Sequence, residues 1–231
     1  MIGFVATVFN FGNGPVPAHR HRNPDGSLGG WVANTALVES TVTVGEHALV
    51  YETAIITGQA MVLGEAHVKG QATMSECGRI EGRATLLGNA KISGSALVGE
   101  EAIIHGNALI FDEASVLGHA QVFGNAKVFD RASLQDYALA LGDSLVSGKS
   151  RMLGRAEIRN YAQLSGEACV AGRAELKEHC LISGHAHISG SAIICGDAQI
   201  ASFARIQRGI HNGDLARKAL GSLVSLDNFI G

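Results

Sequence analysis

Histidine is the residue type with the widest chemical use in this chain, because an imidazole can act as a general base or bind zinc near neutral pH. The sequence contains 10 histidines. The nearest approach to a zinc site is the stretch GHAHISG, with His185 and His187. Zinc needs three or four converging ligands, and no third ligand is in register with this pair. We therefore predict no metal site and no bound cofactor.

His105 is the one candidate for a catalytic base. It follows Leu87 by eighteen residues and precedes Phe123 by eighteen. If these three side chains form one column, the imidazole has apolar neighbours, and such surroundings can shift a pKa into a useful range. The same position suits an interface residue that only stacks on its neighbours. The sequence therefore assigns no catalytic residue beyond this candidate.

A six-residue repeat organises most of the chain. In steps of six from Val32 to Ile200, 29 consecutive positions carry a large apolar residue, with Ala140 as the single exception. Ala stands four residues later in 24 of these hexads, and Gly, Asp or Asn is frequent two residues later. Alternate residues of a strand point to one side, so we expect the Ala and the large residue to face a core. Gly, Asp and Asn tolerate the positive φ of a sharp corner.

A second spacing, of eighteen residues, indicates how many sides the coil has. Asn occurs at the third position after the apolar residue only at Asn89, Asn107 and Asn125. Ser recurs one residue after it, largely at multiples of the same spacing, and stacked identical side chains favour one another. The spacing predicts an all-β fold: a triangular, single-stranded parallel β-helix with eighteen residues per coil and about 9–10 coils.

The stretches VLGEAHVKGQAT and IEGRATLLGNAK resemble the hexapeptide-repeat family. The resemblance covers residues 32–205 and implies that the parallel β-helix is left-handed. The segment DGSLGGWV, residues 25–32, is similar to the entry of poorly characterised bacterial and phage members. The spacing alone also suits the opposite hand, as in bactofilins, a polymer-forming family.

The family resemblance also implies candidate activities. Many members are acyltransferases in which a His acts in a cleft between subunits of a trimer, beside a loop that interrupts the coils. The γ-type carbonic anhydrases of the family bind zinc through three His at a subunit interface. No insertion interrupts the hexads here. Acyl transfer from an acyl-CoA donor, with His105 as the base, is therefore the alternative interpretation.

The two ends are expected to cap the coil, because a solenoid needs terminal caps. Residues 1–31 are predicted to form an N-terminal cap and entry segment, with a strand or apolar plug followed by a turn-rich stretch to Gly30. The basic stretch AHRHR within it is interpreted as a solvated loop. Residues 206–231 are predicted to contain a capping helix that begins at Asp214.

Apolar residues on the outside of the coil predict self-association. The candidate interface residues are Tyr51, Leu87, His105, Phe111, Phe123, Phe129 and Leu141. Exposed apolar area of this extent is uncommon on a soluble monomer. We therefore expect a homo-oligomer, with a trimer as the favoured state.

Net charge and cysteine usage exclude several classes of function. The net charge of −3 favours neither nucleic acid nor an anionic membrane as a partner. The four Cys follow no disulfide or metal spacing, so we expect a cytoplasmic protein, or a virion-associated one if it is encoded by a phage. We expect the protein to be a non-enzymatic structural rod that acts as a scaffold or spacer. The sequence does not identify a protein partner for it.

Overall fold

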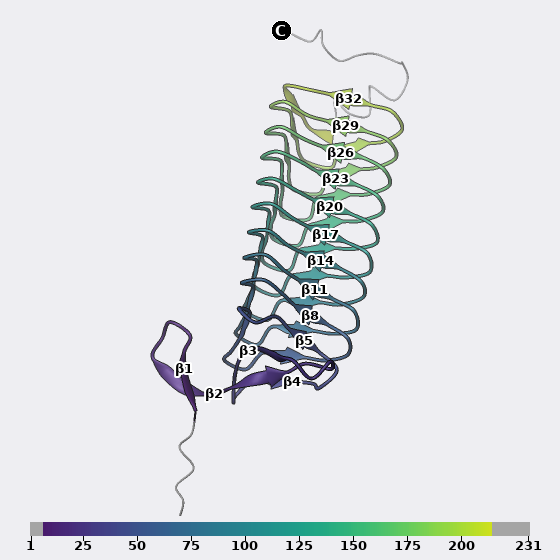
Figure 1. The fold of residues 1–231 in the computed structure, drawn as a ribbon. Helices are drawn as coiled ribbons and strands as arrows, with labels where there is room; N and C mark the ends of the chain where they lie inside the picture. The colour runs from purple at the N-terminus through teal and green to yellow at the C-terminus, as the bar shows by residue number, and fades with distance from the viewer. Residues whose placement is uncertain (1–6, 214–231) are drawn as a thin grey trace, which may run out of the picture.

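The computed structural model describes residues 7–213, which form a three-sided parallel β-solenoid of about 10 turns (Figure 1). Each turn contains 18 residues, and the described residues contain strands but no helix. The predicted fold class and triangular cross-section are confirmed. The predicted helix at Asp214 lies outside the described residues, and the hand of the coil stays a prediction of the family resemblance.

The strands form three sheets, one on each side of the triangle. The first sheet contains β1 (Val8–Asn10), β2 (Pro15–Arg22), β3 (Leu28–Ala33), β6 (Leu49–Val50), β9 (His67–Val68), β12 (Thr85–Leu86), β15 (Ile103–Ile104), β18 (Gln121–Val122), β21 (Leu139–Ala140), β24 (Glu157–Ile158), β27 (Glu175–Leu176), β30 (Ile193–Ile194) and β33 (Ile210–His211). The second contains β4 (Leu37–Val38), β7 (Ile55–Ile56), β10 (Thr73–Met74), β13 (Lys91–Ile92), β16 (Leu109–Ile110), β19 (Lys127–Val128), β22 (Leu145–Val146), β25 (Gln163–Leu164), β28 (Leu181–Ile182) and β31 (Gln199–Ile200). The third contains β5 (Thr43–Val44), β8 (Met61–Val62), β11 (Arg79–Ile80), β14 (Leu97–Val98), β17 (Ser115–Val116), β20 (Ser133–Leu134), β23 (Arg151–Met152), β26 (Cys169–Val170), β29 (His187–Ile188) and β32 (Arg205–Ile206).

The parallel pairing keeps one register along almost the whole coil. Ile103 pairs with Gln121, for example, and each such pair joins residues eighteen apart. The ladder continues between the strands, since the His105 amide donates to the Val122 carbonyl at 2.9 Å. Only the last pair differs, because β30 and β33 align Ile193 with Ile210, a step of seventeen. The coil therefore tightens by one residue at its C-terminal end.

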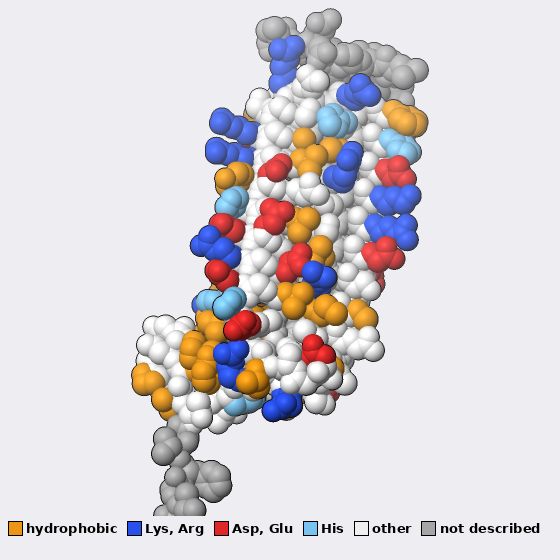
Figure 2. Space-filling model, viewed as in Figure 1, with side chains coloured by type: hydrophobic (Ala, Val, Ile, Leu, Met, Phe, Trp, Pro, Cys, Tyr) orange, Lys and Arg blue, Asp and Glu red, His pale blue; other side chains and the backbone are white. Residues whose placement is uncertain are grey.

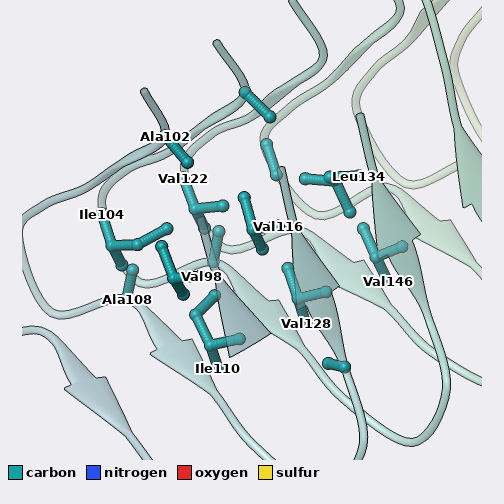
Figure 3. Packing of buried hydrophobic residues seen from close by; sticks show 14 of the residues in the cluster. Val98, Ala102, Ile104, Ala108, Ile110, Val116, Val122, Val128, Leu134 and Val146 are labelled. Carbon is teal, nitrogen blue, oxygen red and sulfur yellow. The ribbon is translucent and has the colours of Figure 1, made fainter. Parts of the chain in front are cut away.

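The core consists of the two columns that the repeat predicts. Large residues such as Ile104 and Val122 and small residues such as Ala102 and Ala108 are all 0% exposed. Figure 3 shows these side chains meeting inside the coil, with successive turns stacked against one another. The Ala column is small because its side chains lie beside the corners, where little space separates adjacent sides.

The corners require left-handed backbone conformations. From Glu52 to Ser202, the residue two positions after each large apolar residue has a φ between 57° and 77°. Gly64 is needed at its corner, since an added Cβ would lie 2.7 Å from the Gly82 carbonyl oxygen of the next coil. Carboxylates occupy several other corners and accept the amide of the next coil, as Glu76 Oε2 does from Gly94 at 2.9 Å.

The N-terminal segment folds differently from our expectation of a turn-rich stretch. Strands β1, β2 and β3 form an antiparallel meander beside the first coils, at the purple end of Figure 1. The expectation that the AHRHR stretch is a solvated loop is wrong, because this stretch forms the end of the eight-residue strand β2. His21 is buried, and its Nε2 lies 2.9 Å from the Val42 carbonyl oxygen.

Asn23 completes this cap by imitating a neighbouring strand. Its Oδ1 accepts the Val44 amide at 2.8 Å, and its Nδ2 donates to the Val44 carbonyl at 3.2 Å. Val44 belongs to β5, the first strand of the third sheet, which has no earlier strand to pair with. One amide side chain therefore satisfies both backbone groups at a sheet edge, which also blocks edge-to-edge pairing.

Asn23→Ala should lower the free energy of unfolding by about 1–2 kcal/mol, because it leaves two backbone groups of Val44 without partners. Urea denaturation followed by circular dichroism measures this change. Asn107→Ala is the matched control, since it also removes an amide that makes two hydrogen bonds, but on an exposed corner. Equal losses in the two variants would contradict the capping role of Asn23.

Two serines interrupt the Ala column inside the core. Ser150 Oγ donates to the Ser147 carbonyl at 2.7 Å, whereas Ser144 Oγ has no hydrogen-bond partner within residues 7–213. Both residues are 0% exposed. A buried hydroxyl without a partner destabilises the folded state, so the two serines should respond differently to the same substitution.

Ser144→Ala should raise the free energy of unfolding by about 1 kcal/mol, since it removes a buried polar group that nothing satisfies. Ser150→Ala should be neutral or destabilising, because it removes a satisfied hydroxyl from the same column. Urea midpoints of the two variants test the difference. A loss of stability in Ser144→Ala would show that its hydroxyl has a partner in solution.

Candidate functional site

The first sheet carries an apolar stripe on its outer face. Residues directly before and after each buried aliphatic residue point outward, and along β12, β15, β18 and β21 most of them are apolar. We define the apolar stripe as Leu87, Ile103, His105, Phe123, Leu139 and Leu141. All of these are half-buried except His105, which is exposed. The parallel register of the first sheet confirms that Leu87, His105, Phe123 and Leu141 form one column with an eighteen-residue spacing.

The surroundings of His105 suit packing better than proton transfer. Its ring meets the Phe123 ring edge-on, with centroids 5.7 Å apart and planes at 72°. No hydrogen bond or ion pair involving its imidazole occurs within the described part of the chain. A catalytic base is usually oriented by a second group. His105 has the ring of Phe123 beside it instead of such an orienting group.

Tyr51 is placed differently from the other predicted interface residues. It is 5% exposed, because Phe11 of the N-terminal hairpin stacks on it with ring centroids 4.9 Å apart. On its coil side, His67 meets its ring edge-on at 6.0 Å. The expectation that Tyr51 is an open surface residue is therefore wrong, since the chain itself covers this part of the first sheet.

Phe111 and Phe129 lie on the second sheet, around the corner from the apolar stripe. They follow β16 and β19, and their rings stack in parallel with centroids 4.9 Å apart and an interplanar angle of 1°. Both are half-buried by this contact. The eighteen-residue spacing brought them together as predicted, although they form a separate patch from the stripe.

Charged residues bound the apolar stripe at both ends. Lys69 precedes it and lies over the Tyr51 ring, 5.8 Å from the centroid. Beyond Leu141, Arg159 contacts Glu157 at 3.3 Å and Glu175 at 3.2 Å. These ion pairs are partly exposed to solvent and contribute little to stability. They set the length of the apolar stripe to four coils.

The corners carry polar ladders with the same eighteen-residue step. Asn89, Asn107, Asn125 and Asp143 are joined by side-chain hydrogen bonds of 2.9–3.1 Å. The Asn column was foreseen from the sequence, but its continuation to Asp143 was not. A search for hydrogen-bonding residues of any type at this step would have found it.

The two other corners combine charge with ring stacking. His119 lies 3.3 Å from Glu101 and stacks on Tyr137 at 4.8 Å. His185 lies 3.4 Å from Glu167 and stacks on Phe203 at 4.9 Å. Figure 2 shows acidic, basic and His side chains following one another along the edges of the coil. These histidines therefore occupy ladders, and within residues 7–213 no three potential ligands converge on a metal position.

The two buried cysteines, Cys169 and Cys180, are not activated nucleophiles. Burial raises the pKa of the Cys180 thiol to about 12, and burial also raises the pKa of Cys169. All four Cys are free thiols. A reactive Cys requires a lowered pKa and access to solvent, and these two buried thiols have neither.

Comparison with known proteins adds no assignment. No protein-family model and no curated protein matches this chain. Within the described residues, no helix has the length and apolarity needed to cross a membrane. The functional argument therefore depends on the geometry of the solenoid itself.

Proposed function

We propose that this protein is a non-enzymatic β-helical rod of the hexapeptide-repeat type, which self-associates and serves as a scaffold or spacer. The observation that supports this most strongly is the unbroken register from β4 to β32, in which no loop is inserted between coils. At about 4.8 Å per coil, ten coils span about 48 Å. Such a rod has a defined length and resists bending, because every coil is hydrogen-bonded to the next.

The apolar stripe supports self-association as part of this proposal. Five apolar side chains remain half-buried over four coils of one flat side, between charged residues at either end. Packing two such sides together would complete their burial, and apolar burial is the main driving force for association. We propose a homo-oligomer, with a trimer favoured, in which the apolar stripe is the contact.

The entry segment DGSLGGWV supports placing the chain with bacterial and phage hexapeptide-repeat proteins. Its last five residues lie in β3 (Leu28–Ala33), which joins the antiparallel cap to the first parallel pair. Gly30 has a close approach there, because an added Cβ would lie 2.0 Å from the Ala48 carbonyl oxygen. We propose a cytoplasmic or virion-associated location for the rod.

Phe123→Glu should convert the wild-type oligomer to monomers, because it buries a charge in the proposed contact. Multi-angle light scattering at micromolar concentration measures the state. Leu117→Glu is the matched control, since Leu117 holds the same position one hexad earlier, on the third sheet. The proposal fails if wild type is already a monomer, or if Leu117→Glu dissociates the oligomer equally.

Acetyl-CoA should show no saturable binding below about millimolar concentration in calorimetry, because no inserted loop forms a cleft beside His105. His105→Ala should weaken the oligomer without affecting any acyl transfer. Micromolar binding of acetyl-CoA that disappears in His105→Ala would instead establish the acyltransferase interpretation.

A further inference from the structure

A cavity lies between the N-terminal hairpin and the first two coils. Its volume is about 300 Å³, which is at the lower end of the range for small-molecule sites. The lining residues are Phe11, Asn13, Gly14, Val16, Pro17, Ala33, Asn34, Thr35, Tyr51 and Glu52. The lining residues combine apolar side chains from both the hairpin and the coil with two amide side chains, two hydroxyl groups and one carboxylate.

Local contacts hold the walls of this cavity in place. Asn10 Oδ1 accepts the amides of Gly12 and Gly14 at 2.9 and 3.0 Å, which orders the hairpin loop. Nδ1 of His19 and Oδ1 of Asn34 lie 2.9 Å apart, which joins β2 to the first corner. A cavity whose walls are already ordered needs less rearrangement when a ligand binds.

The charge of the cavity selects the chemistry of its ligand. Glu52 is the one carboxylate among the lining residues, and these include no Lys, Arg or His. No described side chain forms an ion pair or hydrogen bond with the Glu52 carboxylate. Lys69 lies over the Tyr51 ring but is not among the lining residues. A largely apolar lining with one unpaired carboxylate favours an apolar molecule that carries a positive charge.

We propose that this cavity binds a small molecule with an aromatic or aliphatic body and an ammonium group. The body lies against Phe11, Val16 and Tyr51, and the ammonium group faces Glu52. The site is separate from the apolar stripe, so this proposal goes beyond the scaffold function and does not depend on it. Monomeric and oligomeric protein should bind the ligand alike.

The test compares three probes of matched shape and different charge: 2-phenylethylamine, 2-phenylethanol and phenylacetate. Each is titrated into the full-length protein and followed by NMR. Fluorescence provides a second readout, because Trp31 is the only tryptophan and stacks on Phe9 beside the cavity. The amine should bind saturably at about millimolar affinity, and about fivefold more tightly than the alcohol.

Variants assign the binding to the cavity and its carboxylate. Glu52→Gln should remove the preference for the amine and leave the affinity for the alcohol unchanged. Glu100→Gln is the matched control, because Glu100 occupies the same left-handed corner position in a different sheet, with φ 59° against 60° for Glu52. Glu100→Gln should change neither affinity.

Val16→Trp should fill the cavity and abolish binding of all three probes, and Val16 is exposed enough to accept the larger side chain without disturbing the core. Circular dichroism confirms that the variant is folded. The proposal is overturned by absence of saturable amine binding, by a preference for phenylacetate, or by amine binding that persists in folded Val16→Trp.

Discussion

The parallel backbone ladder with its step of eighteen residues is the constraint on which the rest of this structure depends. A ladder of this kind continues around three corners only if each corner has the same length and conformation. Left-handed residues at every corner from Glu52 to Ser202 meet that condition. Inserting one residue would move every later side chain out of its column. A regular coil therefore requires a repeat without insertions.

Because the register is constant, the outer surface consists of columns rather than scattered residues. Each side chain has neighbours eighteen positions earlier and later, and these decide its environment. Phe111 stacks on Phe129, Asn107 bonds to Asn125, and His105 meets Phe123 edge-on. A His in such a column is held by packing, and a surface built this way favours extended contacts with another flat face. This supports a scaffold more than an enzyme.

The N-terminal cap supplies the first coil with hydrogen-bond partners that the repeat cannot provide. The first coil has no preceding coil, so its strand edges need other partners. Asn23 provides them for Val44 through its side chain, and His21 contacts the Val42 carbonyl. The same hairpin places Phe11 over Tyr51 and leaves a cavity beside Glu52. The cap therefore creates a recess beside the flat faces of the coil.

The sequence by itself determined the coil, because the period of six repeats in each hexad and the step of eighteen repeats in each group of three hexads. It placed Ile104 and Ala108 in the core and Asn89, Asn107 and Asn125 in one column. The tertiary structure decided what has no period: strand β2 where a loop was expected, and the burial of Tyr51 under Phe11. The cap depends on contacts between segments of different pattern, such as Asn23 with Val44, and no spacing in the sequence encodes such a contact.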